Sequence, residues 1–98
     1  MSRELVSVII PVKNEARRIN TLIEGLYGQS YRPIEVIFVD GGSIDGTIEV
    51  IGEAIKKYST NDFIVRLLRE EDFGELRSPA NARNLGALNA KGKYVWFF

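Results

Sequence analysis

The sequence predicts an α/β fold in which helices cover both faces of a parallel sheet. Short apolar runs alternate with amphipathic stretches along all 98 residues. Runs of Val and Ile without alternation are typical of strands that are buried on both faces of a parallel sheet. Apolar residues at intervals of three and four are typical of helices that pack on such a sheet. The predicted order is βαβαβαβ, a three-layer arrangement with right-handed crossovers.

The four predicted strands are the apolar runs. Residues 5–10 are mostly Val, Ile and Leu, and Pro11 is expected to stop this strand. The second strand covers residues 34–39 and the third covers residues 63–68. Residues 94–98 form the fourth strand, which is the most aromatic segment of the chain.

The three predicted helices lie between the strands. The first covers residues 16–27, with Gly28 as its stop, and the second covers residues 47–58. The third begins at Ser78-Pro79, because Ser can cap a helix and Pro at the first helical position loses no hydrogen bond. We expect this helix to end at Lys91-Gly92. Its apolar stripe is expected to be Ala82, Leu85 and Leu88.

The composition excludes several classes of function. Lys plus Arg and Asp plus Glu are both 13, so the net charge is zero. A binder of duplex nucleic acid or a polybasic membrane anchor needs an excess of positive charge. The chain has no Cys and no His, so disulfides, thiolate metal sites and a Cys nucleophile are excluded.

The sequence has no convincing targeting segment. The apolar residues 5–12 follow Arg3, but Pro11 interrupts them and no small-residue cleavage site follows. No stretch approaches the roughly 20 apolar residues of a membrane span. We expect a cytoplasmic protein, which reaches a membrane face only through other parts of a longer parent.

Two polar clusters follow the first two strands, residues 11–15 and residues 40–47. Ligands of open α/β sheets bind outside the carboxyl ends of the strands. Asp40 directly follows an apolar run, so its carboxylate is expected to point into this crevice. Gly41 and Gly42 allow a sharp turn and a close approach of the backbone to a ligand.

A purely structural interpretation of these residues stays open. Asp40 and Ser43 can also serve as ordinary turn residues that satisfy backbone N–H groups. Glu15 can simply be a favourable anion in the first turn of a helix, and Lys13 a solvated loop residue. Asp45 or Ser43 is expected to cap the second helix.

A third polar cluster, residues 77–84, begins the third helix. Arg77 and Arg83 oppose the helix macrodipole there, which suits an anionic ligand such as phosphate. The alternative is that both arginines pair with acidic residues of the preceding loop, namely Glu70, Glu71, Asp72 or Glu75.

Taken together, three segments resemble signatures of the family 2 glycosyltransferases, inverting enzymes of the GT-A fold. They are residues 6–15, residues 40–47, and residues 82–86 followed by 90–98. The resemblance covers essentially the whole chain. It implies a Rossmann-like nucleotide-binding half of the GT-A fold with strand order 3-2-1-4. Residues 1–98 would form a single nucleotide-sugar-binding domain at the N-terminus of a longer enzyme.

The resemblance also implies roles for individual residues, with a UDP-sugar favoured as the donor. Asp40 would accept a hydrogen bond from the base, and Arg83 would lie near the diphosphate. Many relatives carry a second acidic residue where this chain has Gly41. The predicted nucleotide-binding set is Pro11, Lys13, Asn14, Glu15, Asp40, Gly41, Gly42 and Arg83.

In the family, an Asp-x-Asp motif that binds Mg²⁺ or Mn²⁺ follows the apolar run matched by residues 94–98. The chain ends before that motif. We therefore expect the 98 residues alone to be inactive, to bind no metal tightly, and to self-associate through the edge of the last strand. The alternative is a non-catalytic α/β ligand-binding or regulatory module, complete at this length. A receiver-like domain with Asp40 as phosphoacceptor is less supported, because no acidic pair follows the first strand.

Overall fold

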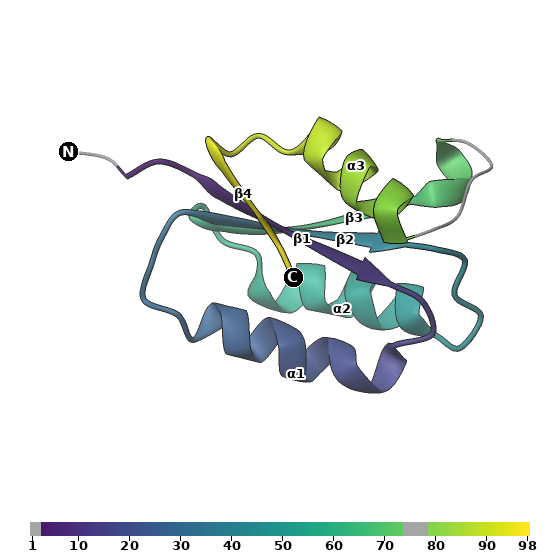
Figure 1. Cartoon of the computed structure of the whole chain (residues 1–98). Coiled ribbons are helices and arrows are strands. Elements are labelled where there is room, and N and C mark those ends of the chain that lie inside the picture. Colours follow the sequence, from purple (N-terminus) through teal and green to yellow (C-terminus); the bar gives the residue numbers. More distant parts are fainter. Residues whose placement is uncertain (1–2, 74–78) are drawn as a thin grey trace.

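The computed structural model describes residues 3–73 and 79–98, with the elements in the predicted order (Figure 1). No helix within these residues is long and apolar enough to cross a membrane. The strands are β1 (Val6–Val12), β2 (Ile34–Asp40), β3 (Phe63–Arg69) and β4 (Tyr94–Phe97). The helices are α1 (Ala16–Tyr27), α2 (Thr47–Tyr58) and α3 (Pro79–Asn89), and a short 3₁₀ helix, η1 (Glu70–Asp72), follows β3.

The strands form one parallel sheet in the order β3-β2-β1-β4, which confirms the predicted topology. Helices α1 and α2 lie on one face of the sheet and α3 lies on the other, giving three layers (Figure 1). All seven residues of β2 are buried, as expected of a central strand. The carboxyl ends of β1 and β2 lie at one edge of the sheet, where the chain turns into α1 and α2 (Figure 1).

Strand β1 continues through Pro11 and ends at Val12, so the expected stop at Pro11 is wrong. In a parallel strand, the backbone groups of successive residues point to opposite neighbours, so those of alternate residues point to the same one. The Ile9 carbonyl accepts a hydrogen bond from Phe98 on the β4 side, and the Val12 carbonyl accepts one from Gly41 on the β2 side. The Pro11 nitrogen therefore faces the β4 side, where the pairing of β1 with β4 has ended at Ile9. The missing N–H costs no hydrogen bond there.

Helix α3 packs on the sheet through a different face from the one predicted. Ala82 is buried, but Leu88 is 84% exposed, so its place in the apolar stripe is wrong. The reason is Gly86, which is buried one turn after Ala82. A Cβ at this position would overlap Ile9 Cγ2 and would lie 3.3 Å from Val39 Cγ2. The glycine lets the helix approach the sheet closely and turns Leu88 toward solvent.

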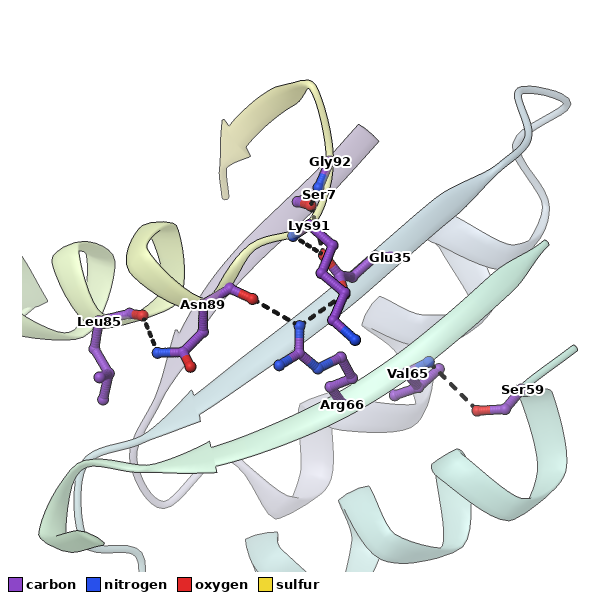
Figure 2. A network of polar contacts seen from close by, with 9 residues as sticks. All are labelled: Ser7, Glu35, Ser59, Val65, Arg66, Leu85, Asn89, Lys91 and Gly92. Atoms are coloured by element: carbon purple, nitrogen blue, oxygen red, sulfur yellow. Dashed lines mark hydrogen bonds and ion pairs between the residues drawn. The ribbon is translucent and has the colours of Figure 1, made fainter. Parts of the chain in front are cut away.

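A buried polar network holds the loop between α3 and β4 against the sheet (Figure 2). Glu35, in β2, is 1% exposed. Its carboxylate accepts hydrogen bonds from the Ser7 hydroxyl at 2.6 Å, the Lys91 amide at 2.9 Å and the Arg66 guanidinium at 2.7 Å. Burial alone would raise the pKa of Glu35, but these hydrogen bonds and the charge of Arg66 together lower it. The network therefore favours the ionised carboxylate.

The network fixes the start of β4 as well as the loop. The Gly92 amide donates to Ser7 Oγ at 2.9 Å, and the Lys93 amide donates to the Leu5 carbonyl at 2.9 Å. Arg66 also donates to the Asn89 carbonyl at 2.9 Å, at the end of α3 (Figure 2). The last strand is thus placed by contacts with the first three strands before its own pairing with β1 begins.

Candidate functional site

The loops that follow β1 and β2 are joined by direct hydrogen bonds. The Asn14 amide donates to Ser43 Oγ at 2.8 Å, and the Asn14 side-chain carbonyl accepts from the Ile44 amide at 2.8 Å. Asn14 adopts a left-handed backbone conformation with φ of 52°, which Asn tolerates better than most residues. The two loops therefore form one surface at the carboxyl edge of the sheet.

The N-termini of α1 and α2 share the same loop residues. The Glu15 amide donates to Thr47 Oγ1 at 2.9 Å, and the Ala16 amide donates to Asp45 Oδ2 at 3.3 Å. Asp45 also accepts from the Thr47 hydroxyl and, at 3.0 Å, from the Thr47 amide. The hydrogen bond from the Thr47 hydroxyl is the main cause that lowers the pKa of Asp45. The N-cap of α2 is Gly46, with φ of 94°, so neither Asp45 nor Ser43 is the cap residue.

Asp40 is 2% exposed, and its carboxylate is used within the loop. Oδ2 accepts from the amides of Gly42 at 2.9 Å and Ser43 at 3.0 Å, and Oδ1 accepts from the Ser43 hydroxyl. The expectation that this side chain points out into a crevice is wrong. The short side chain turns back onto the chain because Gly42, with φ of 104°, folds the backbone over it. Contact with a base stays a prediction.

Gly41 lies against a carboxylate that comes from the end of β3. A Cβ at Gly41 would lie 3.0 Å from Glu70 Oε2, and the Gly41 amide donates to the Val12 carbonyl at 2.9 Å. Glu70 is 4% exposed, and its Oε1 accepts from Asn81 Nδ2 at 2.9 Å. The glycine is therefore required by the approach of Glu70. From the sequence, Glu70 was predicted only as a possible ion-pair partner of Arg77 or Arg83.

An open pocket of about 300 Å³ lies at the joined loops, lined by Asn14, Glu15, Arg17, Arg18 and Asp45. Arg17 and Arg18 were not among the predicted site residues. Two consecutive cations in the first turn of a helix oppose its macrodipole, the same signal that Arg77 and Arg83 carry in the third helix. Arg18 pairs with Glu15 at 2.9 Å.

The other predicted site residues do not lie together at the joined loops. Pro11 is half-buried in β1 and Lys13 is exposed in the loop. Arg83 is exposed on α3, which covers the opposite face of the sheet from α1 and α2. No ion pair of Arg83 with an acidic residue is found in residues 3–73 and 79–98. Arg77 lies outside the described residues.

The described part of the chain contains no group of three or more His, Cys, Asp or Glu side chains that could hold a metal ion. The residues present therefore do not fit the Mg²⁺ or Mn²⁺ that the resemblance implies. A hydrogen-bonded loop surface with exposed cations at its rim is suited to an anionic ligand with polar groups.

The match to known proteins extends over nearly the whole chain. The sequence profile described as glycosyl transferase family 2 matches residues 7–98. The chain belongs to glycosyltransferase family 2. Among its curated relatives, it is 36% identical over 92 residues to the glycosyltransferase GlyG of Streptococcus pneumoniae, covering 94% of this chain and 28% of GlyG. It is 38% identical over 97 residues to an uncharacterized glycosyltransferase of Haemophilus influenzae, covering 99% of this chain and 36% of that protein.

Solved glycosyltransferases share the fold. The mannosyltransferase PcManGT of Pyrobaculum calidifontis, in complex with GDP-Man and Mn²⁺, superimposes with a TM-score of 0.76 at 31% identity, covering 96% of this chain and 26% of PcManGT. Residues 1–349 of TarS from S. aureus, in complex with UDP, superimpose with a TM-score of 0.77 at 26% identity, covering 95% of this chain and 26% of that fragment. The fold of this family 2 chain is the Rossmann-like part of a GT-A fold.

The chain spans 28% and 36% of the length of these two curated relatives.

Proposed function

We propose that this chain is the nucleotide-sugar-binding portion of an inverting glycosyltransferase, with a UDP-sugar as the favoured donor. The observation that carries the proposal is the hydrogen-bonded union of the β1–α1 and β2–α2 loops through Asn14 and Ser43. Ligands of open α/β sheets bind at this edge. PcManGT binds GDP-Man and TarS binds UDP, which supports a nucleoside diphosphate as the recognised group.

The chemistry of the loop residues suits this ligand. Lys13 and Arg17 are exposed cations at the joined loops and can pair with phosphate oxygens. The internal hydrogen bonds of Asp40 and Asp45 hold the loop backbone in one conformation, so little ordering is left for the ligand to impose. A preformed loop surface of this kind lowers the entropic cost of binding.

The transfer reaction needs groups beyond these residues. We propose that Mg²⁺ or Mn²⁺ is bound elsewhere in the full-length enzyme, because the described residues offer no acidic cluster for it. A divalent ion would supply charge neutralisation at the diphosphate leaving group. The 98 residues alone would then bind the donor weakly, without metal-dependent sugar transfer or donor hydrolysis.

The nucleotide site is tested by titrating the wild type and Asp40→Asn with UDP and measuring the affinity of each by NMR. Asn has one acceptor oxygen and no charge, so it cannot accept all three hydrogen bonds that the Asp40 carboxylate accepts, and the loop is held less firmly. UDP affinity is expected to fall about tenfold, which corresponds to roughly one charged hydrogen bond.

Asp62→Asn is the matched control, because Asp62 is exposed and precedes β3 at the opposite end of the sheet from the site. It is expected to leave UDP affinity unchanged. Equal affinity in wild type and Asp40→Asn, with a lower melting temperature in the variant, would show that Asp40 is only a turn residue.

We also propose that the isolated chain self-associates through a second copy at the outer edge of β4. Among the described residues, β4 pairs only with β1. The exposed fraction of Trp96 is 68%, and Tyr94, Phe97 and Phe98 are each more than half exposed. Burying two such aromatics contributes roughly 3–6 kcal/mol. The zero net charge offers little repulsion between copies.

Sedimentation velocity at micromolar concentration checks this proposal. The wild type is expected to form a dimer, and Trp96→Lys is expected to be a monomer. Leu88→Lys is the control, since Leu88 is equally apolar and 84% exposed but lies on α3. A wild type that stays monomeric at high concentration would contradict the proposal.

A further inference from the structure

We propose that the amino edge of the sheet binds an anionic phospholipid surface. The amino edge consists of the segments that lead into the four strands, together with the last turn of each preceding helix: residues 3–5, 24–33, 55–62 and 86–93. Because the strands are parallel, these segments lie at the opposite end of the sheet from the loops that Asn14 and Ser43 join (Figure 1). The inference is independent of the proposed function.

The net charge of zero hides a separation of charge along the strands. The amino edge holds six of the 13 basic residues but three of the 13 acidic residues of the chain, so its formal charge is +3 and the rest carries −3. The negative ends of the macrodipoles of α1, α2 and α3 offset about half of this charge, at roughly 0.5 elementary charge each. An excess of positive charge remains. The acidic residues of the amino edge are Glu4, Glu24 and Asp62, and the basic ones are Arg3, Arg32, Lys56, Lys57, Lys91 and Lys93.

The two ends of the sheet are far enough apart to act separately. β1, β2 and β3 each have seven residues, so roughly 20 Å separate their ends. The Debye length at physiological ionic strength is about 8 Å, so the acidic residues at the far end are largely screened from a partner at the amino edge. A net charge of zero excludes a basic surface only when the two signs are mixed, which is not the case in this chain.

Five of the six cations are available to a partner. Arg32 is the exception, since its guanidinium donates to backbone carbonyls at the end of α1 and in the loop that follows. The other five are exposed, and none of them forms an ion pair within residues 3–73 and 79–98. Each Lys or Arg near an anionic bilayer strengthens binding about fivefold. Contact at this edge leaves the loops at Asn14 and Ser43 open to solvent.

Tyrosines beside these cations favour a lipid surface over a nucleic acid. The Arg3 guanidinium lies 5.3 Å from the centre of the Tyr31 ring, and Lys93 Nζ lies 5.9 Å from the centre of the Tyr94 ring. Tyr94 is 55% exposed. Tyr is common where a protein meets lipid headgroups, because its ring is apolar and its hydroxyl is polar. A nucleobase would stack on the ring, but a cation already covers one face of each of these two rings.

The experiment measures co-sedimentation of the chain with phosphatidylcholine vesicles, with and without an equal amount of phosphatidylglycerol. Wild type is expected to bind the anionic vesicles and not the neutral ones. Raising the salt from about 0.1 M to about 1 M shortens the Debye length from about 10 Å to about 3 Å and is expected to abolish binding. Lys91→Glu combined with Lys93→Glu is expected to weaken binding at least about 25-fold, at about fivefold for each cation removed.

Arg17→Glu combined with Arg18→Glu is the matched control, because it makes the same change in charge at the opposite edge. It is expected to keep binding to the anionic vesicles. Lys56→Gln combined with Lys57→Gln, at the end of α2, tests the amino edge from the other side of the sheet and is expected to weaken binding as well. Amide spectra of each variant show whether it is folded.

Three outcomes overturn the inference. The first is a wild type that does not bind the anionic vesicles. The second is equal weakening in the glutamate variants of the two edges, which would show that total charge and not the amino edge decides binding. The third is binding of a single-stranded oligonucleotide without binding of vesicles, which would assign the edge to a nucleic acid instead.

Discussion

Replacing Glu35 by alanine is expected to lower the free energy of unfolding by about 3 kcal/mol, near the lower end of the range for breaking a buried ion pair. The substitution leaves the Ser7 hydroxyl and the Lys91 amide without their acceptor. Arg66 loses its counter-charge, but its side chain is 25% exposed and can be partly hydrated. This partial hydration is the reason for the lower end of the range.

Urea denaturation at neutral pH measures this loss. Glu35→Gln is the informative second variant, because it keeps the size and one acceptor oxygen but removes the charge. It is expected to lose less than the alanine variant. Glu53→Ala is the control, since Glu53 is exposed on α2 and its removal is expected to change stability by about 0.5 kcal/mol or less. A loss of similar size in Glu35→Ala and Glu53→Ala would contradict the account of the network.

The difference in stability between wild type and Glu35→Gln is expected to depend on pH, and the direction of this dependence follows from the pKa of Glu35. The pKa of Glu35 in the folded chain is below its ordinary value of 4.5, so its contribution is fully present above pH 4.5. It is lost as the pH falls through the folded-state pKa. Wild type is therefore expected to lose more stability than Glu35→Gln when the pH is lowered from 5 toward 3. Asp45, whose pKa is also lowered, is common to both proteins and cancels in the comparison.

The second large effect is expected at Gly86. Gly86→Ala adds a Cβ that overlaps Ile9 Cγ2 and lies 3.2 Å from Ile9 Cδ1, in the smaller core between α3 and the sheet. Overpacking of this kind costs about 1–3 kcal/mol, which exceeds the helix propensity gained by replacing glycine. The same substitution at Gly52, in α2, meets no atom within 4 Å and is expected to stabilise the chain by about 0.5–1 kcal/mol.

Thermal denaturation of the two glycine variants beside the wild type checks this prediction. The chemical change is identical and both positions lie inside helices, so opposite signs isolate the contact with Ile9. A stabilising effect at Gly86 would mean that α3 does not approach the sheet as closely as the structure places it.

The elements of the fold were predictable because the strands are continuous apolar runs, whereas the helices have apolar residues at intervals of three and four. Helix α2 begins and ends at the predicted residues, and β2 extends one residue further, to Asp40. The error at Leu88 has a physical cause, since periodicity counts apolar side chains and gives no weight to a glycine. The face of α3 is centred on Gly86, and the lack of a side chain is what brings this face to the sheet.

The candidate site was predictable in position but not in detail. The carboxyl ends of the first two strands locate the loops, whereas the direction of the Asp40 carboxylate depends on the turn at Gly42. Glu70 could not be found from spacing, because the close approach that buries it joins residues 29 positions apart in different loops. Glu35 did carry a signal, since a charged residue inside an apolar run of a central strand needs a buried partner.

The strand order also means that a central strand waits for one of its two neighbours while the chain is being synthesised. β1 is made first, and its second neighbour, β4, is made only after β2 and β3. Between Val12 and Phe98 the ribosome adds 86 residues, which is 98 minus 12. At about 5–20 residues per second this takes roughly 4–17 s. After β2 has paired with β1, the other side of β1, at Val8 and Ile9, is a temporary sheet edge until β4 is made. The nascent chain is therefore more prone to mispair with other chains before β4 emerges than after it.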